Sequence, residues 1–127
     1  MNDSTLGLGV PRRARPATPH AWSTAAALAS AAACLTFGIA ALRKPDRVGA
    51  ACGLTSDATR VMGVRDLVLG CLIAVHPSPA VLWARAGFDL GDTLLIARRR
   101  PGIAAMATAF GLANAALATA RRGDDRQ

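Results

Sequence analysis

Four apolar blocks, each about as long as a membrane helix, constrain most strongly how this chain can fold. The blocks occupy residues 22–42, 58–75, 80–97 and 102–120. At ~1.5 Å per residue, a helix over the first block is ~31 Å long and matches the ~30 Å hydrocarbon layer of a bilayer. No charged residue interrupts that block. The pattern predicts an all-α fold, a four-helix transmembrane bundle with short connections.

Polar segments flank these blocks at both ends of the chain. Residues 1–20 are polar and carry three prolines and three arginines, which predicts a disordered basic tail. Residues 121–127 are predicted to form a polar C-terminal tail. A single membrane domain is therefore expected over residues 21–120.

Prolines and glycines mark the expected connections between the helices. Pro45 and the glycines after it predict a loop over residues 43–55, and Ser56 or Asp57 is expected to cap the next helix. Pro77 and Pro79 predict a tight turn. A turn this short places the second and third helices antiparallel and adjacent.

The charge distribution indicates a membrane surface rather than nucleic acid. The net charge of +7 and the pI of 11.2 come largely from arginine clusters at the block ends. A nucleic-acid surface usually forms a basic stripe with stacking aromatic side chains, which this sequence lacks. Cations beside apolar helices suit the headgroups of a lipid bilayer. We therefore expect a lipid bilayer as partner and no nucleic acid.

The second and third blocks carry charges in their middles. Arg65 and Asp66 lie in the second block, and Arg85, Asp89 and Asp92 lie in the third. At 100° per residue, Asp89 and Asp92 fall within about 40° of Arg85, so all three share one face of the helix. Ionisable residues inside a membrane are costly and often functional. The five residues are predicted to form a buried polar layer or a ligand site.

Counting from the turn predicts which of these charges meet. Arg65 lies between Asp89 and Asp92 in depth, within ~3 Å of either, so it can bridge to one or both. Arg85 can pair with Asp89, which leaves Asp66 without an expected partner. Two arginines and three aspartates give a net charge of −1. Three ways of balancing it stay open: Arg60 reaching inward, a protonated aspartate, or a cationic or hydrogen-bonding ligand.

Several roles are compatible with this layer. Buried ion pairs can simply fix which helices pair and in what register. Alternatively, the protein binds a lipid-like ligand, a lipophilic small molecule or a partner. A small membrane enzyme that uses an Asp/Arg pair for acid–base chemistry on a lipophilic substrate is the alternative function. A further hypothesis is a soluble, alanine-rich helical bundle. The first block argues against it, because a helix over that block has no polar face to present to water.

Small residues predict where helices approach closely. Ser30, Cys34 and Gly38 form a ridge on the first helix. Gly87 and Gly91 form a G-x-x-x-G pair on the third helix, on a different face from its charges, and predict a possible homo-oligomer contact. The three cysteines have neither metal-ligand spacing nor a nearby histidine, so no metal, cofactor or catalytic residue is assigned. Cys52 is read as a loop thiol.

The motif Gly63-x-Arg65-Asp66-x-x-x-Gly70, with the preceding Pro45 and the later Asp92, resembles a family of small membrane proteins. That family comprises bacterial and fungal four-helix integral membrane proteins of unknown function. The resemblance covers roughly residues 25–120 of this sequence. It implies four membrane helices and supplies no activity.

Two tryptophans indicate how the chain is oriented in the membrane. Trp22 and Trp83 would share one interface of a four-span protein, as an aromatic belt requires. The cations are balanced between the two sides, so the positive-inside rule does not decide. We expect a multi-pass protein of the cell membrane with both termini cytoplasmic.

Overall fold

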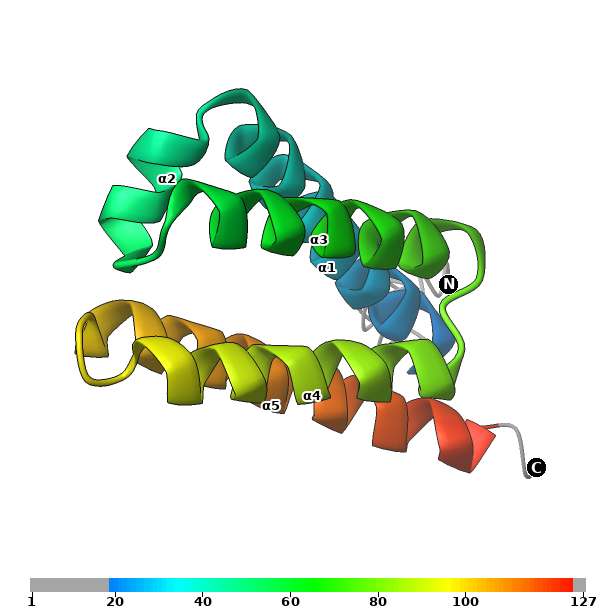
Figure 1. Cartoon of the computed structure of the whole chain (residues 1–127). Coiled ribbons are helices and arrows are strands. Elements are labelled where there is room, and N and C mark those ends of the chain that lie inside the picture. The colour runs from blue at the N-terminus through cyan, green and yellow to red at the C-terminus, as the bar shows by residue number, and fades with distance from the viewer. Residues whose placement is uncertain (1–18, 125–127) are drawn as a thin grey trace, which may run out of the picture.

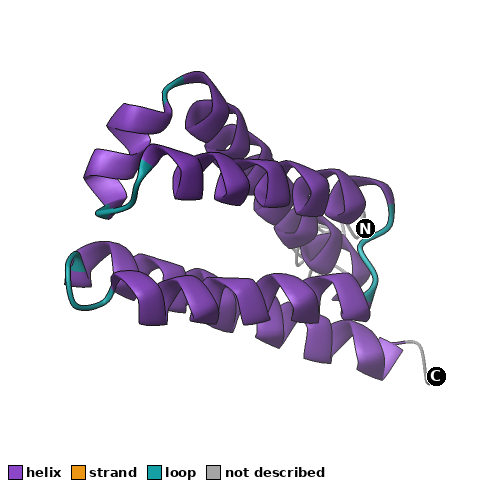
Figure 2. Cartoon of the chain, viewed as in Figure 1, coloured by secondary structure: helices purple, strands orange, loops and turns teal. Residues whose placement is uncertain are grey.

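The computed structural model describes residues 19–124, all of whose regular structure is helical (Figure 2). The helices are α1 (Pro19–Arg43), α2 (Pro45–Cys52), α3 (Ser56–Val75), α4 (Pro79–Ile96) and α5 (Pro101–Asp124). The all-α expectation is therefore confirmed for the described residues. Most of the predicted N-terminal tail lies outside them, and residues 121–124 of the predicted C-terminal tail are helical.

The segment predicted as a loop over residues 43–55 contains the additional helix α2. Pro45 stands in its first turn, where a proline costs no hydrogen bond, so this residue starts a helix instead of blocking one. Gly53 ends α2 with a φ of 72°, a left-handed conformation that favours glycine. The prediction of a loop was wrong because it treated the proline and the glycines only as residues that interrupt a helix. A proline can also begin a helix, and a glycine can end one.

Side-chain caps fix where α3 and α4 begin. The Thr55 hydroxyl accepts a hydrogen bond from the Ala58 amide at 3.3 Å, so the cap lies one residue before the predicted Ser56. The Ser78 hydroxyl accepts one from the Val81 amide at 3.4 Å, and Pro79 opens α4. The three residues between α3 and α4 turn the chain tightly, as expected.

The long helices form two pairs. α1 packs along α3, and α4 packs along α5, whereas contacts between the pairs are far fewer (Figure 1). In Figure 1 the α1–α3 pair and α2 form one layer above the α4–α5 pair, and the layers converge at the turn between α3 and α4. This arrangement leaves the inward faces of α3 and α4 opposite one another.

Glycines allow the first pair to approach closely. A Cβ added at Gly38 would lie 2.8 Å from the Gly63 carbonyl oxygen, and one added at Gly63 would lie 3.1 Å from the Gly38 oxygen. Ser30 and Cys34 on α1 are buried as well. The predicted small-residue ridge therefore does lie at a helix contact, with α3 as a partner.

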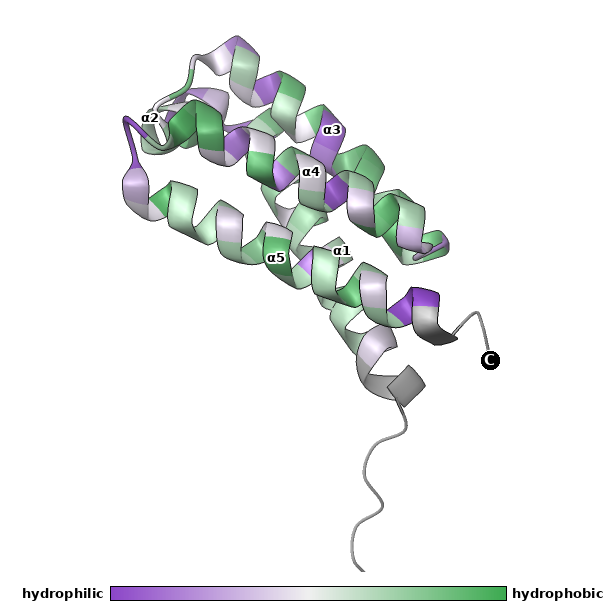
Figure 3. Cartoon of the chain, turned by 90° about the horizontal axis from the view of Figure 1, so that it is seen from below, coloured by the Kyte–Doolittle hydropathy of each residue, from purple (hydrophilic) through white to green (hydrophobic). Residues whose placement is uncertain are grey.

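The outside of the molecule is apolar. Large hydrophobic side chains are exposed on all four long helices, up to 85% for Val75 and 81% for Leu94. Figure 3 shows apolar residues along the lengths of these helices. Buried polar residues include Asp66, Arg85 and Asp89. A small apolar core is also buried, but several buried charges together with many exposed large hydrophobic side chains are unusual for a water-soluble domain.

The predicted four-helix transmembrane bundle is wrong in its number of spans. Among the described residues, two stretches are long and apolar enough to cross a membrane, Ser23–Arg43 in α1 and Pro101–Arg122 in α5. Only 33% and 28% of these windows are buried, whereas the core helix of a soluble protein is mostly buried. α3 and α4 fail the same criteria because α3 carries four charged residues and α4 carries three.

Candidate functional site

The five predicted charged residues meet between the two helix pairs. We call them the ionic layer: Arg65 and Asp66 from α3, with Arg85, Asp89 and Asp92 from α4. Helical periodicity places the three α4 residues on the face that points at α3. The layer is therefore a buried polar link between the pairs.

Arg65 connects the two helices. Its Nη1 and Nη2 donate to Asp92 Oδ1 and Oδ2 at 2.8 and 2.7 Å, a two-pronged contact that Lys cannot make. Its Nε and Nη2 also donate to Asp66 Oδ1 at 3.0 and 2.8 Å. Burial lowers the pKa of Arg65, but the bonds to Asp92 and Asp66 outweigh burial and raise it. Arg65 is therefore permanently charged, and the predicted bridge to Asp92 is confirmed.

Arg85 joins the remaining two carboxylates. Its Nη1 lies 2.9 Å from Asp66 Oδ1, and its Nη2 lies 2.7 Å from Asp89 Oδ1. The expected pairing with Asp89 is therefore confirmed, whereas the expectation that Asp66 lacks a partner was wrong. The Asp66 carboxylate contacts both arginines. Arg60 does not reach inward, because it pairs with exposed Asp57 at 3.2 Å.

Three polar atoms in this layer have no hydrogen-bond partner: Asp89 Oδ2, Arg85 Nε and Arg85 Nη1. Arg85 Nη1 still forms an ion pair with Asp66, whereas the other two atoms have no counterpart, and their residues are only 3% and 8% exposed. Asp89 forms an ion pair with Arg85 alone, whereas the Asp66 carboxylate contacts both arginines and Asp92 accepts two hydrogen bonds from Arg65. Asp89 is thus the carboxylate whose negative charge is compensated least.

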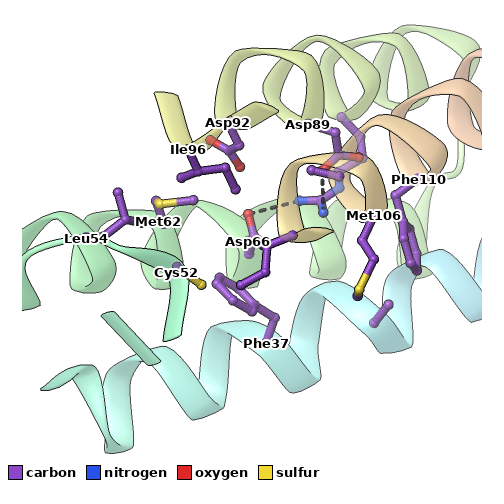
Figure 4. Close-up of a pocket in the computed structure, with 14 residues that line it drawn as sticks. Phe37, Cys52, Leu54, Met62, Asp66, Asp89, Asp92, Ile96, Met106 and Phe110 are labelled. Atoms are coloured by element: carbon purple, nitrogen blue, oxygen red, sulfur yellow. Dashed lines mark ion pairs between the residues drawn. The ribbon is translucent and has the colours of Figure 1, made fainter. Parts of the chain in front are cut away.

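A cavity of about 250 Å³ lies beside the ionic layer (Figure 4). Four of the five charged residues, all but Arg65, line it. The rest of its lining is almost entirely apolar and comes from all five helices and the α2–α3 connection: Ala33, Phe37, Cys52, Leu54, Met62, Ile96, Ile103, Met106, Ala107 and Phe110. The site is an apolar pocket with charges on one wall.

Sequence reasoning missed the apolar lining. Phe37 and Phe110 are ordinary hydrophobic residues of apolar helices, and no local pattern says that they face one cavity. Cys52 was read as a loop thiol, but it ends α2 and borders the cavity, where burial raises its pKa. These residues come together through the pairing of the helices, which the sequence pattern does not specify.

Arginines join the pairs at both ends of the molecule. Where the layers diverge in Figure 1, Arg99 Nη1 donates to the Gly53 carbonyl and Arg100 Nη2 to the Ala50 carbonyl, both at 3.1 Å. At the opposite end, Arg121 Nη1 donates to the Pro77 carbonyl at 2.9 Å, and its Nη2 donates to the Ser23 carbonyl at 3.4 Å. These bonds hold the two pairs around the cavity.

Other predicted features lie outside this site. Gly87 and Gly91 are exposed, with no atom within 4 Å of an added Cβ, so the homo-oligomer contact stays a prediction. Within residues 19–124, no group of at least three His, Cys, Asp or Glu side chains is placed to hold a metal ion. Trp83 is 42% exposed and lies under the Arg122 guanidinium, 5.9 Å from the ring centre.

No family model, curated protein or solved structure matches this chain. The resemblance carried by Gly63, Arg65, Asp66 and Gly70 therefore stays a prediction. The function has to be inferred from the geometry of the site.

Proposed function

We propose that this protein is an integral membrane protein that binds a lipophilic small molecule between its two helix pairs. The observation that carries the proposal is the apolar cavity with the ionic layer on one wall. Pockets of this kind, mostly apolar with a few convergent polar groups, are typical of small-molecule sites. The cavity volume, about 250 Å³, lies just below the range of ~300–1,000 Å³ for such sites and suits only a compact ligand.

The apolar exterior supports a membrane location. Exposed leucine, valine and phenylalanine side chains cover the long helices, and lipid chains would remove this surface from water. We propose that α1 and α5 cross the membrane. They run antiparallel, and Arg121 near the end of α5 contacts Ser23 near the start of α1, so both termini would lie on one side. A cytoplasmic location of that side stays a prediction.

A purely structural role for the ionic layer explains fewer of its features than ligand binding does. Ion pairs that only fix helix register would be expected to satisfy one another and to leave no space beside them. Here Asp89 Oδ2 and Arg85 Nε have no partner, and a cavity adjoins their residues. A ligand would account for both the open volume and the unpaired polar atoms.

Native mass spectrometry of the full chain, released from mild detergent, tests this proposal. We expect a small-molecule adduct on the wild type and on Ala109→Trp, whose residue is exposed and does not line the cavity. Ala107→Trp places its indole in the cavity and should remove the adduct. An adduct that persists at equal occupancy in Ala107→Trp would show binding elsewhere and contradict the proposal.

A further inference from the structure

The unpartnered atoms of the ionic layer identify the chemistry of the ligand head. Asp89 is 3% exposed, lines the cavity, and has one carboxylate oxygen without a hydrogen-bond partner. A buried carboxylate oxygen without a partner costs free energy that a hydrogen-bond donor would recover. Oδ2 itself is covered by protein atoms, so the ligand head should donate a hydrogen bond to the Asp89 carboxylate after its side chain turns toward the cavity.

The charge of the layer selects a cation among the possible donors. Arg65 and Arg85 contribute +2 and Asp66, Asp89 and Asp92 contribute −3, so the layer carries a net charge of −1. Arg60, which could have restored neutrality, pairs with Asp57 at the surface. Protonation of Asp89 would also remove the excess charge, but a cation bound beside its carboxylate favours the charged form. One positive charge in the cavity balances the layer, whereas an anion would raise the imbalance to −2.

We propose that the pocket binds a protonated amine carried on a compact apolar body. The ammonium lies against Asp89, and the apolar body fills the space among Phe37, Met62, Met106 and Phe110 (Figure 4). Arg85 Nε, which also has no hydrogen-bond partner, donates to an oxygen next to the amine where the ligand has one. This inference rests on the proposed ligand-binding function and specifies its substrate class.

Three probes that share one body and differ only in their heads test the inference. They are 4-phenylbutylamine, 4-phenylbutan-1-ol and 4-phenylbutanoate, titrated by calorimetry at pH 8 into the full chain in phosphatidylcholine nanodiscs. Empty nanodiscs correct for partition into lipid. We expect the amine to bind at least ~10-fold more tightly than the alcohol, because a hydrogen bond between two charged groups is stronger than one from a neutral hydroxyl. The carboxylate should bind most weakly.

Asp89→Asn removes the charge at nearly constant volume and should bring the amine and the alcohol to equal affinity. Asp57→Asn, at a carboxylate whose side chain is 92% exposed, is the matched control and should keep the wild-type preference. The NMR methyl signals of Met62 and Met106, recorded on methionine-labelled wild type, should shift when the amine is added, because both residues line the cavity. This measurement locates the amine without a variant, so it holds even if Asp89→Asn folds poorly.

The outcomes distinguish a failure of the amine inference from a failure of the proposed ligand-binding function. Equal binding of all three probes by the wild type would overturn the amine inference and leave a ligand pocket. Binding of none of them, together with no adduct in mass spectrometry, would overturn the proposed function itself. A preference for the amine that survives in Asp89→Asn, or that leaves both methyl signals unmoved, would show that the cation binds elsewhere and also overturns the inference.

Discussion

At the scale of single residues, the arginines and aspartates of the ionic layer are not equivalent. Two guanidinium groups stabilise three carboxylates, so the loss of one arginine takes the net charge from −1 to −2. The loss of one aspartate takes it to zero. Asp89, which has an unpartnered oxygen, is the aspartate whose charge the fold needs least.

We therefore expect Arg85→Gln to lower the free energy of unfolding by about 3 kcal/mol, because it leaves buried carboxylates uncompensated. Asp89→Asn should change stability little or increase it. Arg60→Gln, at an exposed pair, is the control and should cost less than about 1 kcal/mol. Thermal unfolding followed by circular dichroism in mild detergent measures all three. A loss in Asp89→Asn as large as that in Arg85→Gln would contradict this account of the layer.

At the scale of helices, backbone contact between α1 and α3 depends on glycine. The two backbones meet at Gly38 and Gly63, where each added Cβ would meet the carbonyl oxygen of the opposite helix. A buried hydrogen bond from Ser30 Oγ to Asn114 Oδ1, at 2.8 Å, connects α1 to α5 as well. The pairs are thus held by close packing within each pair and by polar contacts between them.

Glycine-to-alanine substitutions at two positions separate the effect of packing on stability from the effect of helix propensity. Gly63→Ala should destabilise the protein by about 1–3 kcal/mol, because its methyl would lie 2.9 Å from Ala41 Cβ and close to backbone. Gly87→Ala meets no atom within 4 Å and should stabilise α4 by up to about 1 kcal/mol. The melting temperatures in the same detergent compare the two. If Gly63→Ala also raised the melting temperature, the close approach of α1 and α3 would be disproved.

Much of the helical structure follows from the sequence, because long apolar blocks and capping residues are local signals. The contact between Arg65 and Asp92 was also predictable, since a short turn fixes the depths of both residues in antiparallel helices. The contact of Asp66 with both arginines was not predictable, because it depends on the direction in which the Arg85 side chain points. The number of membrane spans was overestimated because block length was given more weight than the charges of α3 and α4.

At the scale of the whole molecule, the ionic layer is buried while many large hydrophobic side chains are exposed. This combination appears once the helices are paired: the same α4 that buries Asp89 and Asp92 exposes Leu94 at 81% and Leu95 at 71%. The cavity arises at the same scale, because its lining comes from all five helices. Neither property can be assigned to a single helix in isolation.

Alkaline carbonate extraction of membranes from cells that express the tagged full chain tests the central claim most directly. An apolar exterior with two membrane-spanning helices predicts that the protein stays in the membrane pellet at high pH and is released only by detergent. Release into the alkaline supernatant without detergent would contradict membrane integration. The exposed apolar surface would then have to be covered by something other than lipid.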